Sequence, residues 1–215
     1  MLNELKPDVI ITQGLCDVCA ISSSEIEVVL KGTLCTLPSS TQIISLNGKS
    51  FEEICSEILK LGEQLDAEKE AKQHVDKAIA RRDKLDRLPK YSRKILSLEW
   101  IDPYFSAWHW VPEQIEIAGF RSAIGQKGEH SRVISIEEII ESDPDDIAVI
   151  CCGYKLHENK LFAEKLKNNK EINFLRPFKS DNIYSFDSDA YFSRPTTRII
   201  EGAEQLRKSV LDSLS

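Results

Sequence analysis

The sequence predicts an α/β protein with mainly parallel sheets, arranged as two similar lobes on either side of one long helix. Short apolar runs rich in Val and Ile alternate with amphipathic segments, which is typical of helices packed on parallel strands. Residues 5–14 and 142–153 also share one pattern: a helix end, a Pro-Asp break, an apolar strand and a glycine-bearing loop. The long charged helical pattern between the two copies predicts that they belong to separate lobes.

The first 90 residues are expected to form two strands and four helical segments. Ser50 with Glu53 three positions later forms a capping box, which marks the start of a helix. Apolar residues then recur every three or four positions to residue 65 and, after a soft break, up to Pro89, which ends the helix. The expected strands are 9–12, which should be buried, and 42–46, and the expected helices are 4–6 (a helix end), 25–30, 51–65 and 66–88.

The remaining residues repeat the alternation of strands and helices. Ser135 with Glu138 forms a second capping box, and Asp143-Pro144 ends the helix that follows it. The glycines between residues 119 and 128 predict a flexible loop. The expected strands are 95–99, 147–151 and 183–186, and the expected helices are 112–118, 136–142, 156–168 and 199–214.

Charge and hydropathy exclude several classes of function. The net charge of −7 disfavours general nucleic-acid binding, which needs a basic surface. No apolar run approaches the ~20 residues of a membrane span, and the N-terminus has no signal-peptide pattern. The chain as written is therefore expected to stay in the compartment where it is made. Its abrupt start, with a strand by residue 9, predicts that sequence is missing upstream.

All three tryptophans lie within residues 99–113, a segment interrupted by two prolines, which predicts a loop. Such a loop either packs its tryptophans into the core or forms a pocket wall that stacks a flat ligand. Its position after a strand favours the pocket, because open α/β sheets bind ligands at the carboxyl ends of their strands. Four loops qualify by that rule: 13–24, 100–112, 152–156 and 187–194. The candidate ligand-binding residues are Gln13, Cys16, Trp100, Trp108, His109, Trp110, Tyr154, Tyr191, Phe192 and Arg194.

The cysteines and the histidine in this set allow a different interpretation. Cys16 and Cys19 have the spacing of a redox-active or metal-binding cysteine pair. A structural zinc site would need a second pair, and the only candidate, Cys151 with Cys152, consists of adjacent residues that chelate poorly. Free thiols and no resident metal or cofactor are therefore expected. His109 could ligate a metal or a cobalt-bearing ligand, or be a structural histidine. Glu99 and Asp102 lie close together, but the sequence shows no partner for acid–base catalysis.

Several of these stretches resemble the helical-backbone (class III, TroA-like) substrate-binding proteins of ABC importers, in the branch that binds cobalamin and iron–siderophores. The resemblance rests on Leu-Lys-Pro-Asp-Val-Ile-Ile-Thr-Gln at 5–13, Cys-Asp-Val-Cys-Ala at 16–20, Glu-Trp-Ile-Asp-Pro at 99–103, His-Trp-Val-Pro-Glu at 109–113 and Ala-Tyr-Phe-Ser-Arg-Pro at 190–195. It covers nearly the whole chain in order. It implies two Rossmann-like lobes, a partial N-terminal lobe at 1–65, a connecting helix at 66–90 and a C-terminal lobe at 91–215.

The resemblance also implies a function without catalysis. A monomer is expected to clamp a corrinoid or a similar metal chelate between its lobes, and acidic residues would dock onto the importer permease. The docking candidates are Asp17, Glu25 and Glu113. Family members carry further N-terminal strands and a signal peptide, and this chain shows neither. It is thus expected to be extracytoplasmic by resemblance, or cytoplasmic if the chain is complete. A thiol- or metal-binding protein and a truncated fragment that binds nothing are the alternatives.

Overall fold

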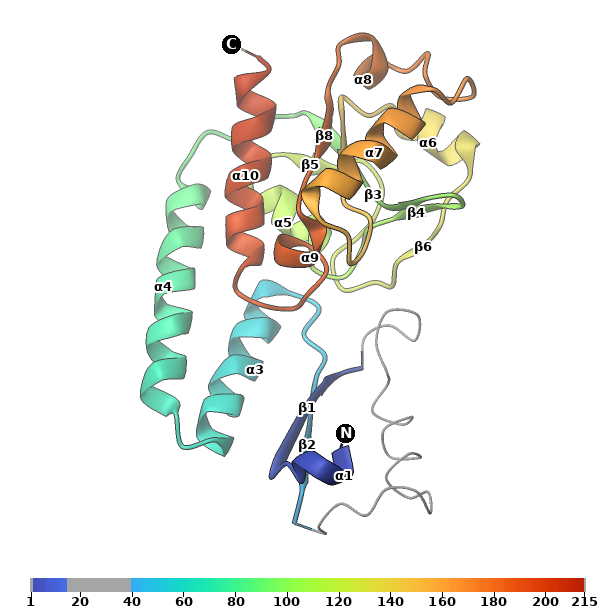
Figure 1. Ribbon diagram of the computed structural model, residues 1–215. Coiled ribbons are helices and arrows are strands. Elements are labelled where there is room, and N and C mark those ends of the chain that lie inside the picture. The colour runs from blue at the N-terminus through green and yellow to red at the C-terminus, as the bar shows by residue number, and fades with distance from the viewer. Residues whose placement is uncertain (1, 15–39, 215) are drawn as a thin grey trace.

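A computed structural model of the chain describes residues 2–14 and 40–214 and divides into two lobes bridged by helices (Figure 1). The N-terminal lobe contains α1 (Leu2–Leu5), β1 (Val9–Gln13), β2 (Gln42–Leu46) and the start of α3 (Phe51–Gln64). Helix α4 (Glu68–Asp86) runs back along α3 to the C-terminal lobe. The predicted helix at 25–30 lies outside the described residues.

Strands β1 and β2 pair in parallel, with Val9 opposite Gln42 and Gln13 opposite Leu46. Both predicted strands are confirmed, but the prediction of a buried first strand is wrong. Ile11 is 50% exposed, and no residue of either strand is fully buried. Within the described residues this sheet has two strands, so it lacks the flanking strands and helices that bury both faces of a larger parallel sheet.

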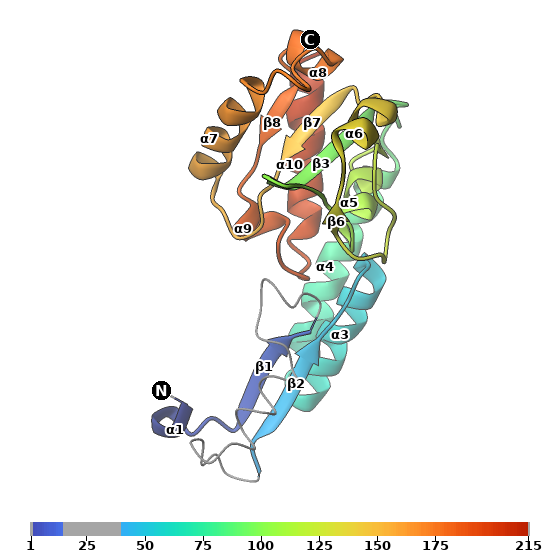
Figure 2. The same ribbon diagram turned by 90° about the vertical axis from the view of Figure 1, so that its right-hand side faces the viewer.

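Helices α3 and α4 form an antiparallel hairpin that links the lobes (Figure 2). The predicted cap is confirmed: Ser50 Oγ accepts the Glu53 amide at 3.2 Å. Gly62 is needed where the two helices approach, because a Cβ there would lie 2.4 Å from that of Ala71. On α4, Arg81 pairs with Glu201 at 2.5 Å and with a second carboxylate of the last helix, so α4 is held against the C-terminal lobe.

The C-terminal lobe is built on a sheet of six strands in the order β6-β4-β3-β7-β8, with β5 also beside β3. Strands β3, β7, β8 and β5 pair in parallel, whereas β4 runs antiparallel to β3 and β6. The elements of this lobe are β3 (Lys94–Ile101), β4 (Tyr104–Ser106), α5 (Val111–Ile117), β5 (Arg121–Ser122), β6 (Arg132–Val133), α6 (Ile136–Ser142), β7 (Asp146–Val149), α7 (Leu156–Lys167), α8 (Arg176–Lys179), β8 (Ile183–Ser185), α9 (Ser188–Tyr191) and α10 (Ile199–Asp212).

Two apolar cores cover the two faces of this sheet. One core joins α3 and α4 to α5 and α10, so the bridging helices are packed into the same core as this lobe. The other lies under α6 and α7, where Ile139 and Leu166 pack on the sheet. The capping box of α6 is confirmed, with Ser135 and Glu138 bonded reciprocally. The mixed α/β class is therefore confirmed, whereas the exact lobe bounds at 65 and 90 stay a prediction.

The tryptophan segment is only partly the loop that the sequence predicts. Trp100 belongs to β3, and the chain turns through a cis Asp102–Pro103 bond into β4, which pairs back on β3. The prediction missed this hairpin because β4 has three residues and gains its order from pairing with β3 rather than from local propensity. Among the residues described, no helix combines the length and the apolar character needed to cross a membrane.

Candidate functional site

The N-terminus of α3 meets the C-terminal lobe through two polar contacts, and an ion pair within that lobe supports one of them; we call these three contacts the lobe junction. Glu113 Oε2 accepts the Phe51 amide at 2.7 Å, and Glu113 Oε1 pairs with Lys127 at 2.9 Å. Lys49 Nζ lies 3.3 Å from His130 Nε2, to which it donates. Because a helix N-terminus favours a negative charge, Glu113 stabilises α3 as well as joining the lobes.

Beside the junction, His109 occupies a strained and buried position. It has a φ of 53°, its ring is only 8% exposed, and its buried Nδ1 has no partner among the described residues. Burial, together with the smaller effects of the neighbouring His130 and Lys49, lowers the pKa of His109 to about 4. The two imidazoles meet edge to face, with their centroids 5.4 Å apart. His109 is therefore a neutral ring with one unused polar atom.

At the carboxyl end of β3, Glu99 is an acid in a mostly apolar setting. Burial raises its pKa to about 7, the Ser131 hydroxyl offsets part of that effect, and Cys152 adds to it. Cys152 follows β7, and its amide donates to the Glu99 carbonyl at 3.1 Å. A group that changes charge near neutrality thus lies at the sheet edge where α/β proteins bind ligands.

The three tryptophans occupy three different environments. Trp100 packs against Tyr154 at 5.6 Å and Phe162 at 6.1 Å between ring centroids, and all three rings are part-buried. Trp108 is also part-buried, with the Arg132 guanidinium 5.5 Å over its ring and no acceptor for Nε1 among the described residues. These two tryptophans keep some exposed ring surface that a ligand could cover.

Trp110 and Phe192 are instead accounted for by core packing. Trp110 is 4% exposed and donates from Nε1 to the Phe192 carbonyl at 3.0 Å, and Phe192 is 2% exposed. Both side chains belong to the core between α5 and α10. The core interpretation of the tryptophan segment therefore holds for Trp110, and neither side chain has ring surface free for a ligand.

The other predicted site residues are dispersed. Tyr191, on α9, is part-buried beneath the Arg198 guanidinium at 5.0 Å. The exposed Arg194 pairs with Asp189. Gln13 ends β1 in the other lobe and is part-buried. Cys16, Cys19, Asp17 and Glu25 lie outside the described residues.

Two of the three cysteines whose structure is described are buried thiols of low reactivity. Burial raises the pKa of Cys55 to about 11 and that of Cys151 to about 12, so both stay protonated at neutral pH. No three His, Cys, Asp or Glu side chains of the described residues are placed to hold a metal ion. The sequence did not single out Lys49, His130 or Ser131, because only the tertiary fold brings them to Glu99 and His109.

Residues 1–190 match the family described as periplasmic binding protein. Similar solved structures include an ABC transporter substrate-binding protein from Listeria monocytogenes EGD-e, at 18% identity and a TM-score of 0.79, with 98% of this chain and 79% of that chain covered. The periplasmic vitamin B12 binding protein of Vibrio cholerae is also similar, at 17% identity and a TM-score of 0.67, with 99% of this chain and 77% of that chain covered.

A third similar structure is the periplasmic heme binding protein of Vibrio cholerae, at 17% identity and a TM-score of 0.74, over 96% of this chain and 78% of that one. No curated protein matches the sequence. The fold of these structures and the family match agree with two α/β lobes bridged by helices. The members of this family are substrate-binding proteins, so a chain that belongs to it is a binding protein rather than an enzyme. The chain belongs to the periplasmic binding protein family.

Proposed function

We propose that this protein binds a corrinoid or a similar flat metal chelate between its lobes and delivers it to an ABC importer. The observation that carries the proposal is the arrangement of strand ends. Strands β1 and β2 point their carboxyl ends toward the C-terminal lobe, and α9 and β6 lie on the side of that lobe facing them (Figures 1 and 2). Carboxyl ends of parallel strands are where open α/β sheets bind ligands.

The side chains at that edge suit a large ligand with apolar faces. Trp108 and Trp100 offer part-buried aromatic rings, and Tyr191 adds a third on α9. Stacking on such rings contributes ~1 kcal/mol per good contact beyond the apolar area that is buried. The partnerless Nδ1 of His109 is a donor or metal ligand available to a chelate that enters the edge.

Delivery to a permease rests on the family and on acidic residues. Of the three docking candidates, Glu113 is placed: its side chain is 17% exposed and engaged with Lys127 and with α3. Asp17 and Glu25 lie outside the described residues, and all three stay proposed docking residues. The thiol- or metal-binding alternative has less support, because the placed Cys151 is buried and protonated.

Intrinsic tryptophan fluorescence tests the proposal. Cobalamin, and separately haemin, should quench the emission saturably in the folded protein. Trp108→Phe should weaken binding by about fivefold or more, because the smaller ring offers less stacking surface. Phe174→Leu is the matched control, since it removes an exposed ring just before α8, away from the proposed edge, and leaves all three tryptophans in place. Absence of saturable quenching by either ligand would remove the metal-chelate proposal.

A further inference from the structure

Arg207 on α10 is the one buried arginine of the described residues, and it has no acidic partner there. Its side chain is 7% exposed. Nη1 donates to the Ala118 carbonyl at 2.9 Å, and the guanidinium lies 5.5 Å over the Tyr91 ring. Within the described chain no carboxylate comes within ion-pair distance of it. A guanidinium has five N–H donors, and the Ala118 carbonyl is the one hydrogen-bond acceptor for Arg207 among the described residues.

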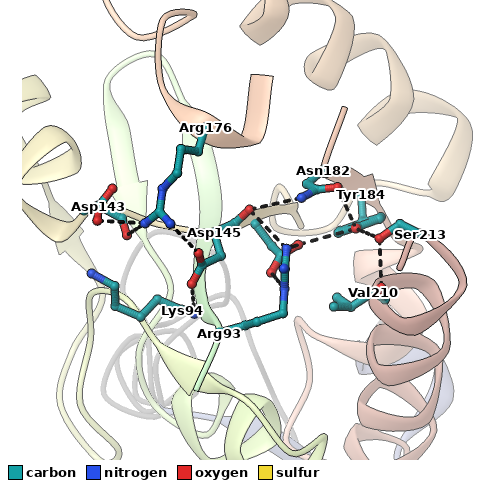
Figure 3. Close-up of polar contacts among 10 residues, drawn as sticks. Arg93, Lys94, Asp143, Asp145, Arg176, Asn182, Tyr184, Val210 and Ser213 are labelled. Carbon is teal, nitrogen blue, oxygen red and sulfur yellow. Dashed lines mark hydrogen bonds and ion pairs between the residues drawn. The ribbon is translucent and has the colours of Figure 1, made fainter. Parts of the chain in front are cut away.

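Two other arginines of the same lobe have acidic partners. Arg93 forms a two-pronged ion pair with the fully buried Asp146, at 2.8 Å for each prong. Arg176 reaches Asp143 at 2.7 Å and Asp145 at 2.9 Å (Figure 3). Acidic side chains are therefore present at this end of the lobe, and Arg207 differs from Arg93 and Arg176 because it has no acidic partner among the described residues.

The guanidinium of Arg207 lies beside an open pocket of about 640 Å³. Nη1 lies so close to Gly119 that a Cβ there would be 2.4 Å away, and Gly119 and Tyr91 both line the pocket. Arg121 also lines it, is exposed, and has no acidic partner among the described residues. The pocket is completed by Lys90, Ser92, Glu116 and Phe120.

The charges around this pocket favour an anion. Of the charged residues that line the pocket, Lys90 is neutralised by Asp86 at 3.0 Å, which leaves Arg121 and Glu116. Arg207, which adjoins the lining residue Gly119, adds a second positive charge. The hydroxyls of Tyr91 and Ser92 add neutral donors. A planar guanidinium recognises a carboxylate or a phosphate through two parallel hydrogen bonds.

We propose that Arg207 and Arg121 form a binding site for a small free oxyanion, a carboxylate or a phosphate, on the C-terminal lobe. The site lies where the connection from α4 to β3 passes α10, at the end of the lobe remote from β1 and β2 (Figure 1). It is thus separate from the edge proposed for the metal chelate, and either proposal can fail without the other. An anion there would tie the end of the bridging helix to α10.

Isothermal titration calorimetry with inorganic phosphate, and separately with acetate, tests this site in the full chain at constant ionic strength set with chloride. Saturable one-to-one binding of either anion is expected. Arg121→Ala should weaken it about tenfold, and Arg207→Lys should do the same, because each removes a charge-assisted hydrogen-bonding fork. Lys208→Ala is the matched control: it removes one positive charge from the exposed side of the same helical turn and should leave the affinity unchanged.

Two results would overturn the proposal. The first is no saturable heat with either anion above the chloride control. The second is an affinity in Arg121→Ala equal to that of the parent, which would place any bound anion elsewhere. If Arg207→Lys does not fold, Arg121→Ala decides alone, because Arg121 is exposed and its removal leaves the core intact.

Discussion

Replacing Glu99 by glutamine is expected to abolish a loss of stability that the parent protein suffers above neutral pH. Burial raises the pKa of Glu99 from 4.5 to about 7 in the folded state. A raised folded pKa means that the folded state binds more protons than the unfolded state between those values. The stability contributed by the protonated acid is therefore fully present below pH 4.5 and is lost as the pH rises through 7.

The size of the effect follows from the two pKa values. Moving from pH 6.5 to pH 8 should cost the parent ~0.8 kcal/mol of unfolding free energy through Glu99. The carboxyl is part-buried rather than sealed, so this is an upper figure. Glutamine keeps the shape and does not ionise, so Glu99→Gln should lack this slope and exceed the parent in stability at pH 8.

His109 changes the stability with pH in the opposite direction, and it therefore determines the pH range in which the effect of Glu99 can be measured. Its pKa falls from 6.5 to about 4 on folding, so its contribution is lost as the pH falls from 6.5 toward 4. Between pH 4.5 and 6.5 the two groups oppose each other, and above 6.5 Glu99 titrates alone. Urea unfolding followed by circular dichroism at several pH values from 6.5 to 8 isolates the Glu99 effect.

A raised pKa of Glu99 is refuted if the parent and Glu99→Gln show parallel stability curves from pH 6.5 to 8. Parallel curves would mean that the carboxyl is solvated and ionised like an ordinary surface acid. Cys152→Ser serves as a control, because it removes a minor neighbour of Glu99 while the burial of the carboxyl remains.

Three further substitutions test the fold and the junction. Asp146→Asn leaves the Arg93 guanidinium without its buried partner and should destabilise the protein by ~3 kcal/mol in urea melts, so a loss under half of that would contradict the matched pair. Glu113→Gln weakens the contact with the Phe51 amide and should lower stability by ~1–2 kcal/mol, with faster amide exchange at the start of α3; unchanged exchange would argue against its capping role. Ser135→Ala should cost ~1 kcal/mol through the α6 cap, measured by thermal melting, and a neutral result would show that the cap is dispensable.

Local signals in the sequence located most helices and strands. The features that the sequence did not reveal depend on strand pairing and burial in the folded protein. The caps at Ser50 and Ser135 were predictable because capping depends on residues three positions apart. Trp108 and Trp110 are two residues apart and chemically identical, yet one is part-buried and the other lies in the core. How far each tryptophan is buried depends on how α5 packs against α10, and no local sequence pattern encodes that packing.

The same limit applies to the candidate site. The sequence placed candidates at the carboxyl ends of strands, and the topology of parallel strands made that inference possible. The raised pKa of Glu99 could not be read from its neighbours in sequence, because it arises from burial in the folded protein and is partly offset by Ser131, which lies far along the chain. An acid in an otherwise apolar strand is the signal that could have drawn attention to it.

Equilibrium dialysis of the purified chain against cobalamin, haemin and a ferric hydroxamate tests the central proposal most directly. We predict that the folded protein retains one equivalent of at least one of these chelates, with a dissociation constant in about the micromolar range or below, and that Trp108→Phe retains less. Retention of none of the three at ~100 μM by protein with an intact circular dichroism spectrum would contradict the proposed function.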